Sequence, residues 1–156
     1  MVGFSEVKVK MSNLPHAQSY RDLLVYQKAR QVSREIFKLT KGFPREEMYS
    51  LTDQVRRSSR SVGAQIAEAW AKRRYEAHFI SKLTDADGEC LETQHWIETA
   101  LDCEYITQAQ SATLIAQHDE IGRLLAGMIV KAAMFCGRPT YSVREQAPEY
   151  FTNIDH

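Results

Sequence analysis

A chain of 156 residues provides about one domain, and 44% hydrophobic with 26% charged residues is the composition of a folded globular protein. This composition excludes wholesale disorder. Twenty Lys and Arg balance twenty Asp and Glu, so the chain lacks the overall basic charge that is typical of nucleic-acid-binding domains.

Residues 1–18 have no sustained periodicity and are expected to form a flexible lead, in which Met11 offers a second possible start. They contain no apolar signal segment, and no stretch of the chain approaches 18 apolar residues. Three cysteines without C-x-x-C spacing indicate neither a disulfide framework nor a zinc site, and their helical patterns predict buried, inert thiols. We therefore expect a cytoplasmic protein without membrane contact.

Residues 20–41 form the first predicted helix. Its apolar residues recur at steps of four and three, which places them on one face: Val25, Ala29, Val32, Ile36 and Leu39. Gly42 is expected to end the helix in the left-handed conformation. Pro44, Glu46 and Glu47 then predict the first turn of a short lead-in helix, with acids at the positive end of its dipole.

Three more helices are predicted, over residues 51–69, 75–105 and 107–136. Their apolar seams are Leu51, Val55, Ser58, Val62, Ile66 and Ala69, then Phe79, Leu83, Ala86, Cys90, Thr93, Ile97 and Ala100, then Leu114, His118, Ile121, Leu125, Met128, Ala132 and Phe135. Gly63 interrupts the second helix at a cost near 1 kcal/mol relative to Ala, for which close approach of a neighbouring helix is the expected reason.

Four long amphipathic helices with short connections predict an all-α fold, an antiparallel up-down-up-down four-helix bundle over residues 19–137. The spacing of the seams predicts left-handed packing near 20°. The polar residues 138–156 are expected to form a disordered tail.

Several motifs match one family in the right order. They are Y-R-D-L-L-V-Y-Q-K-A at residues 20–29, F-P-R-E-E at residues 43–47, and the segment from Gln54 to Ala69, which corresponds to Q-x-R-R-x-x-x-S-I-x-x-N-I-A-E-G. The chain therefore resembles the four-helix bundle proteins of the ribosomal RNA intervening-sequence family. Gln65 replaces the usual Asn of that motif and Ala69 the usual Gly.

The resemblance implies a ring-shaped homopentamer and no enzymatic activity. Distant relatives are accessory subunits of retroelement reverse transcriptases and contact nucleic acid. No catalytic motif or cofactor-binding loop occurs in the sequence, so we expect neither catalysis nor a cofactor.

Charge is distributed unevenly along the chain. Residues 19–41 and 51–74 each carry six cations against two acids, whereas residues 75–105 carry one cation against eight acids. Two interpretations are open. The basic and acidic helices can pair within or between subunits or face water. Alternatively, five copies of the second helix can present a ring of arginines that binds phosphates.

The candidate nucleic-acid-binding residues are Arg56, Arg57, Arg60, Arg73 and Arg74, of which the last two lie about 21 Å further along if the helix continues. The candidate structural or interface residues are Gln54, Gln65, Glu68 and Trp70. Glu92 and His95 form a single E-x-x-H, and with His118 they could bind a metal, but a di-iron site needs two such motifs. A hydrogen-bonded core histidine is the simpler interpretation of His118.

These observations predict a non-enzymatic, homo-oligomeric module that acts as a scaffold or accessory factor and contacts RNA or DNA through the basic second helix. The alternatives are a purely protein-binding scaffold and a carboxylate–histidine metal-binding bundle.

Overall fold

The computed structural model describes residues 17–137, and every regular element in that range is helical. In chain order the elements are η2 (Tyr20–Asp22), α1 (Leu24–Thr40), η3 (Arg45–Glu47), α2 (Leu51–Ala71), α3 (Glu76–Asp102), α4 (Gln108–Val130) and α5 (Ala132–Phe135). The expected lead over residues 1–16 and the expected tail over residues 138–156 lie outside the described residues. Within them, no helix has the length and apolarity needed to cross a membrane.

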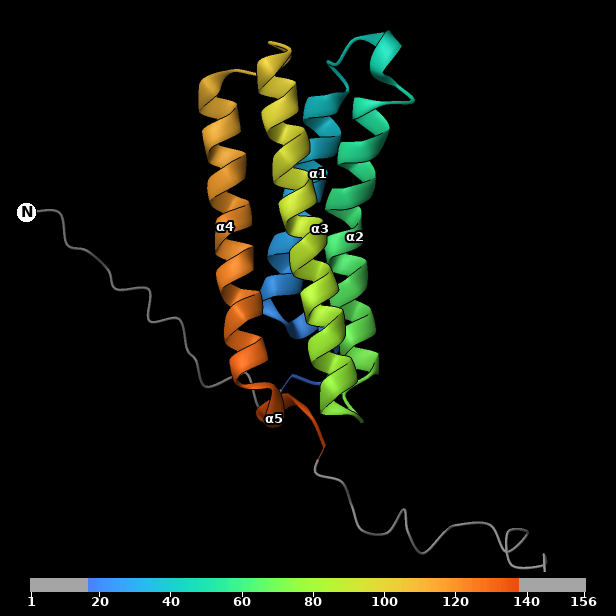
Figure 1. The fold of residues 1–156 in the computed structure, drawn as a ribbon, viewed down its shortest axis with the longest axis vertical. Coiled ribbons are helices and arrows are strands. Elements are labelled where there is room, and N and C mark those ends of the chain that lie inside the picture. The colour runs from blue at the N-terminus through green and yellow to red at the C-terminus, as the bar shows by residue number, and fades with distance from the viewer. Residues whose placement is uncertain (1–16, 138–156) are drawn as a thin grey trace, which may run out of the picture.

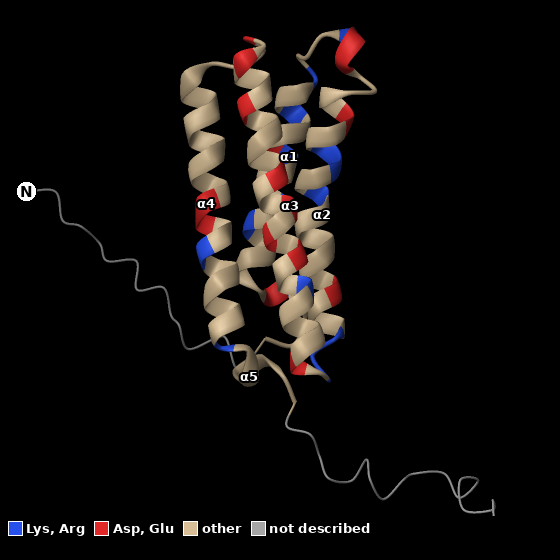
Figure 2. Ribbon diagram, viewed as in Figure 1, with Lys and Arg blue, Asp and Glu red and all other residues tan. Residues whose placement is uncertain are grey.

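The four long helices pack side by side around one core (Figure 1). Each contacts two neighbours, in the closed order α1, α2, α3, α4 and back to α1. Because the connections between these long neighbours are short, successive helices run in opposite directions. The prediction of an all-α fold with four long helices is therefore confirmed. Figure 2 shows acidic residues along α3 and basic residues near the start of α2.

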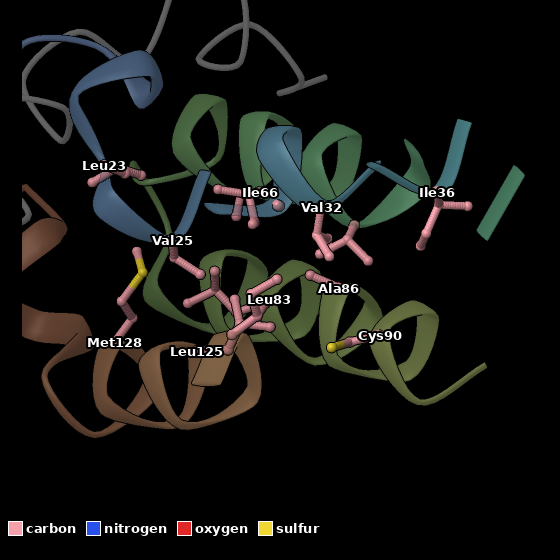
Figure 3. Close-up of a cluster of buried hydrophobic side chains, with 14 of the residues drawn as sticks. Leu23, Val25, Val32, Ile36, Ile66, Leu83, Ala86, Cys90, Leu125 and Met128 are labelled. Atoms are coloured by element: carbon pink, nitrogen blue, oxygen red, sulfur yellow. The ribbon is translucent and has the colours of Figure 1, made fainter. Parts of the chain in front are cut away.

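The predicted seams form the core. Every seam residue predicted for α2, α3 and α4 is buried, and the seams converge between the helices (Figure 3). The fully buried side chains include the large apolar ones of Ile36, Ile66, Phe79, Leu83, Ile121 and Leu125. In α1 the seam shifts at its end, where Leu39 is only half-buried and Thr40 is buried instead.

Two predicted helices are interrupted by single residues. The first begins as the short helix η2, which Ser19 and Asp22 close with a capping box, and the extended backbone of Leu23 then separates η2 from α1. The fourth ends at Val130, because Lys131 leaves helical geometry before α5 begins. Both breaks preserve burial, since Leu23 and Phe135 remain in the core.

The prediction that Gly42 adopts the left-handed conformation is wrong. No described glycine has a positive φ, and the one described residue that does is Glu104, with φ of 61°. Glu104 follows α3, where its amide donates to the carbonyl of Leu101 and the amide of Tyr105 donates to that of Ala100. This pair of bonds is the Schellman motif that usually takes glycine.

Glu47 explains the F-P-R-E-E motif. The short helix η3 confirms the predicted lead-in turn, and Glu47 at its end accepts hydrogen bonds from the hydroxyl of Ser50 and the amide of Leu51, which is the first residue of α2. Its other oxygen accepts from the hydroxyl of Tyr105 at 3.0 Å, and this bond raises the pKa of Tyr105 to about 12. One carboxylate thus caps α2 and ties together two loops at one end of the bundle.

The interior also contains a small polar layer. The hydroxyl of Thr93 donates to the carbonyl of Glu89 and lies 2.9 Å from the hydroxyl of Ser58, from which it can accept. His118 is fully buried beside Cys90, whose thiol donates to the His118 carbonyl. Burial raises the pKa of the Cys90 thiol to about 12, as expected for an inert cysteine. The same expectation is wrong for Cys103, which is exposed.

Candidate nucleic-acid interface

Three cations gather around one aromatic ring where α1 faces α2. The ring belongs to Phe37, on the outward side of α1. Lys41 places its ammonium 4.8 Å from the ring centre, and the guanidinium carbons of Arg56 and Arg60 lie 4.8 and 5.5 Å from it. Arg56 is fixed further by a 2.7 Å hydrogen bond from its Nε to the hydroxyl of Thr40. We refer to Phe37, Lys41, Arg56 and Arg60 as the cation cluster.

No carboxylate of residues 17–137 forms an ion pair with the cation cluster. The ion pairs within residues 17–137 use Lys28, Arg57 and Lys82 as their cations. Each of the three cations lies 4.8 to 5.5 Å from the same ring centre, so any two are at most about 10 Å apart, which is close to the Debye length of about 8 Å in physiological salt, and their mutual repulsion is only partly screened. Cation–π attraction offsets only part of this repulsion. The site therefore has the electrostatics of an anion-binding surface.

Arg57 differs from its two neighbours in sequence. It points to α3, where it forms ion pairs with Glu92 and Glu89. The hydrogen bond to Glu92 raises the pKa of Arg57, while burial raises the pKa of Glu89. Pairing of a basic with an acidic helix inside one subunit thus accounts for Arg57, but not for Arg56 or Arg60.

The second predicted patch lies at the other end of α2. Arg73 stacks on the ring of Trp70, with 3.4 Å from the guanidinium carbon to the ring centre, and its Nε donates to the Trp70 carbonyl. Burial lowers the pKa of Arg73. Arg74 is exposed, 5.9 Å from the ring centre of Tyr75. The structure therefore leaves Arg73 committed to Trp70 and separates both residues from the cation cluster.

The candidate structural residues lie where α2 meets α3. Lys82 of α3 binds Glu68 at 3.0 Å and Gln65 at 3.4 Å, and it also pairs with Asp85. The two polar residues of the α2 motif therefore bind one lysine on the neighbouring helix. Trp70 packs partly buried against the core, and Gln54 is half-buried in α2.

The residues considered for a metal do not converge. Glu92 is bound to Arg57 and to the indole of Trp96, while His95 is exposed. His118 is buried, with Nδ1 at 2.7 Å from the carbonyl of Leu114. Across residues 17–137, no three His, Cys, Asp or Glu side chains are placed to hold a metal ion together.

Sequence reasoning missed three residues of the interface. Phe37 lies in the first predicted helix but is not among the candidate residues, whereas in the structure its ring is 36% exposed and carries the cations. Lys41 and Thr40 at the end of α1 complete the site. The available signal was a large aromatic with a lysine four residues later, which places the two side chains on one face of the helix.

Four long helices around a common core, with the cation cluster outside it, place the chain in the class of all-helical proteins. Residues 21–127 match the family of 23S rRNA-intervening sequence proteins. The chain belongs to this family, which confirms the resemblance inferred from its motifs.

A solved structure agrees with this assignment. The chain is similar to a protein of unknown function from the S23 ribosomal protein family of Bacteroides thetaiotaomicron, with 34% sequence identity and a TM-score of 0.62. The match covers 68% of this chain and 95% of that chain. No match was found among curated proteins.

Proposed function

We propose that the protein is a non-enzymatic, cytoplasmic, homo-oligomeric scaffold that contacts RNA or DNA through the cation cluster. The observation that carries the proposal is the convergence of Lys41, Arg56 and Arg60 on Phe37 without a carboxylate partner among residues 17–137. Arginine and lysine neutralise phosphates, and each phosphate contact adds affinity that falls with salt.

This proposal narrows the set of residues predicted from the sequence. Arg56 and Arg60 remain as phosphate ligands, joined by Lys41. Arg57 is removed because Glu89 and Glu92 already neutralise it, and Arg73 because it is held by Trp70. Arg74 stays exposed but has no second described cation stacked with it.

An anisotropy titration with labelled RNA and DNA in low salt tests the nucleic-acid contact. The double variant Arg56→Gln, Arg60→Gln should weaken binding at least about tenfold and reduce the salt dependence by about two phosphate contacts. The matched control is Lys72→Gln, Arg74→Gln, which removes the same charge from the other end of α2. Equal losses in the two double variants would leave only non-specific attraction, and the proposed site would be wrong.

Self-association rests on a second surface, the outer face of α3 and α4. Small and apolar residues are exposed there and on the adjoining α5: Gly88, Leu91, Ala126, Gly127, Val130 and Met134. Val130 is 84% exposed, Met134 60% and Leu91 59%, and a group of exposed apolar side chains, unlike a single one, marks an interaction surface. A neighbouring copy would cover this face, and repeated head-to-tail contact closes into a ring. The family resemblance favours five copies.

Light scattering coupled to size-exclusion chromatography tests the proposed ring-shaped oligomer. Five copies of a 17.9 kDa chain give about 90 kDa. Leu91→Glu, Val130→Glu should produce smaller species, whereas Leu24→Glu, which places a charge on exposed α1 surface, should not. A single-chain mass for the wild type at working concentration would refute self-association.

A purely protein-binding scaffold is the second candidate, because the exposed side chains of Met48 and Tyr49 adjoin the cation cluster. Capture of a stoichiometric acidic protein that survives nuclease treatment, together with no binding to RNA or DNA, would support this candidate over the first.

A further inference from the structure

An open groove of about 550 Å³ runs beside the cation cluster on the outer side of α2. Its walls include Arg56 and Arg60 from the cluster and Met48 and Tyr49 from the turn that precedes α2. Tyr49 is 95% exposed, so its ring contacts almost nothing in the described part of the chain. An aromatic face and two unneutralised guanidinium groups therefore line the same concave surface.

A second groove continues the first. It has a volume of about 390 Å³ and shares Arg60 and Ala64 with the groove beside Tyr49. Tyr26 and Arg30 of α1 line it, so each groove combines a tyrosine with arginine. The floor is made of small residues of α2, which include Gly63 and Ala64 and leave room along the helix. The shared wall makes one path along the junction of α1 and α2.

We infer that this path binds a single-stranded nucleic acid, with its phosphates on Arg56 and Arg60 and a base stacked on Tyr49. The inference rests on the proposed function and specifies its ligand. Single-strand sites combine a positive groove with aromatic side chains that stack on unpaired bases. In a duplex the base faces are already stacked on one another, so Tyr49 would have no partner.

The dimensions and charge of the groove lead to the same ligand. A duplex presents its phosphates on a convex surface with its bases stacked inside, whereas a single strand can place an unpaired base in a depression of about 550 Å³. Asp53 is the single acid that lines this groove, against three arginines, of which Glu89 and Glu92 neutralise Arg57. The remaining charge complements a polyanion.

The experiment compares an unstructured labelled oligouridine with an RNA duplex of the same strand length, both titrated in low salt with the full chain. The wild type should bind the single strand more tightly. Tyr49→Ser should weaken single-strand binding by between about 5-fold and 150-fold, the effect of losing one stacked base, and should leave duplex binding unchanged. Tyr75→Ser is the matched control, because Tyr75 is also an exposed tyrosine beside an arginine but lies at the other end of α2.

The outcomes separate the inference from the proposed function. Equal or tighter binding of the duplex, or single-strand binding that is indifferent to Tyr49→Ser, overturns the inference while leaving a phosphate-binding surface intact. Equal losses in Tyr49→Ser and Tyr75→Ser also overturn it, because stacking would then not depend on the groove. Absence of binding to either RNA by the wild type refutes the proposed function itself.

Discussion

His118 should make the stability of the protein sensitive to mild acid. Its imidazole is fully buried on the α4 seam, Nδ1 is bound to the carbonyl of Leu114, and no donor among residues 17–137 reaches Nε2. Burial lowers the pKa of His118 from its ordinary value of 6.5, because a buried imidazolium loses hydration. The folded protein therefore holds His118 neutral at a pH where the unfolded chain has already taken up a proton.

The direction of this pH dependence follows from the number of protons that the folded and unfolded states bind. Below pH 6.5 the unfolded state binds the extra proton, so the free energy of unfolding falls as the pH falls, until the folded pKa is reached. One such group contributes a slope of up to about 1.4 kcal/mol per pH unit, and thus at most about 1.4 kcal/mol by pH 5.5. Above pH 7 the effect vanishes.

Replacement of His118 by leucine should remove this component. Urea unfolding followed by helical circular dichroism, at about pH 7.5 and about pH 5.5 and one protein concentration, should show a smaller loss of stability in His118→Leu than in the wild type. With a slope of about 1–3 kcal/mol per molar urea, the difference is roughly 0.5–1.4 M in the midpoint. His95→Gln, which removes an exposed histidine, is the control. Identical pH dependence in the wild type and His118→Leu would refute the reasoning.

Three further changes test the packing. Ile66→Ala should lower the free energy of unfolding by about 2–5 kcal/mol in a urea titration, because Ile66 is 0% exposed; a loss below 1 kcal/mol would contradict this. Because the proposed neighbouring copy covers Gly88, Gly88→Ala should not raise the thermal midpoint, although within one subunit a Cβ would meet no described atom within 4 Å and an uncovered helix would gain up to about 1 kcal/mol; a raised midpoint would indicate that the α3 face is open. Ser58→Ala and Thr93→Val should each cost about 1 kcal/mol, and the double variant less than their sum; strict additivity would mean that the hydroxyls do not interact.

The helical seams could be predicted because a spacing of four and three depends only on the geometry of the helix. The breaks at Leu23 and Lys131 could not, since both residues lie within continuous apolar patterns and the local backbone is set by capping and by packing at the ends of the bundle. Gly63 was expected to allow close approach of a helix. A Cβ there would meet the ring of Tyr26 at 3.6 Å, an ordinary contact, so the structure does not require glycine.

The candidate interface was predictable in part. Arg56 and Arg60 are four residues apart and share a face, whereas Arg57 is rotated by about 100° from Arg56 and faces another neighbour. The sequence alone does not indicate which helix lies on which side of α2, so it could not show that Glu89 and Glu92 neutralise Arg57 while Phe37 and Lys41 gather the other two.

The hydrogen bonds that Glu47 accepts from Ser50, Leu51 and Tyr105 have a consequence for Tyr49. The hydroxyl of Ser50 donates to the carboxylate of Glu47, and the amide of Ser50 donates to the carbonyl of Glu47. The exposed Tyr49 therefore lies in a turn whose two ends are hydrogen-bonded to each other. The backbone beneath the exposed ring is already ordered, so stacking on a base costs only the rotational freedom of the Tyr49 side chain itself. Tyr105→Phe removes the hydrogen bond to Glu47 and so loosens this turn. It should therefore weaken binding of the single-stranded nucleic acid without changing any group that contacts the ligand.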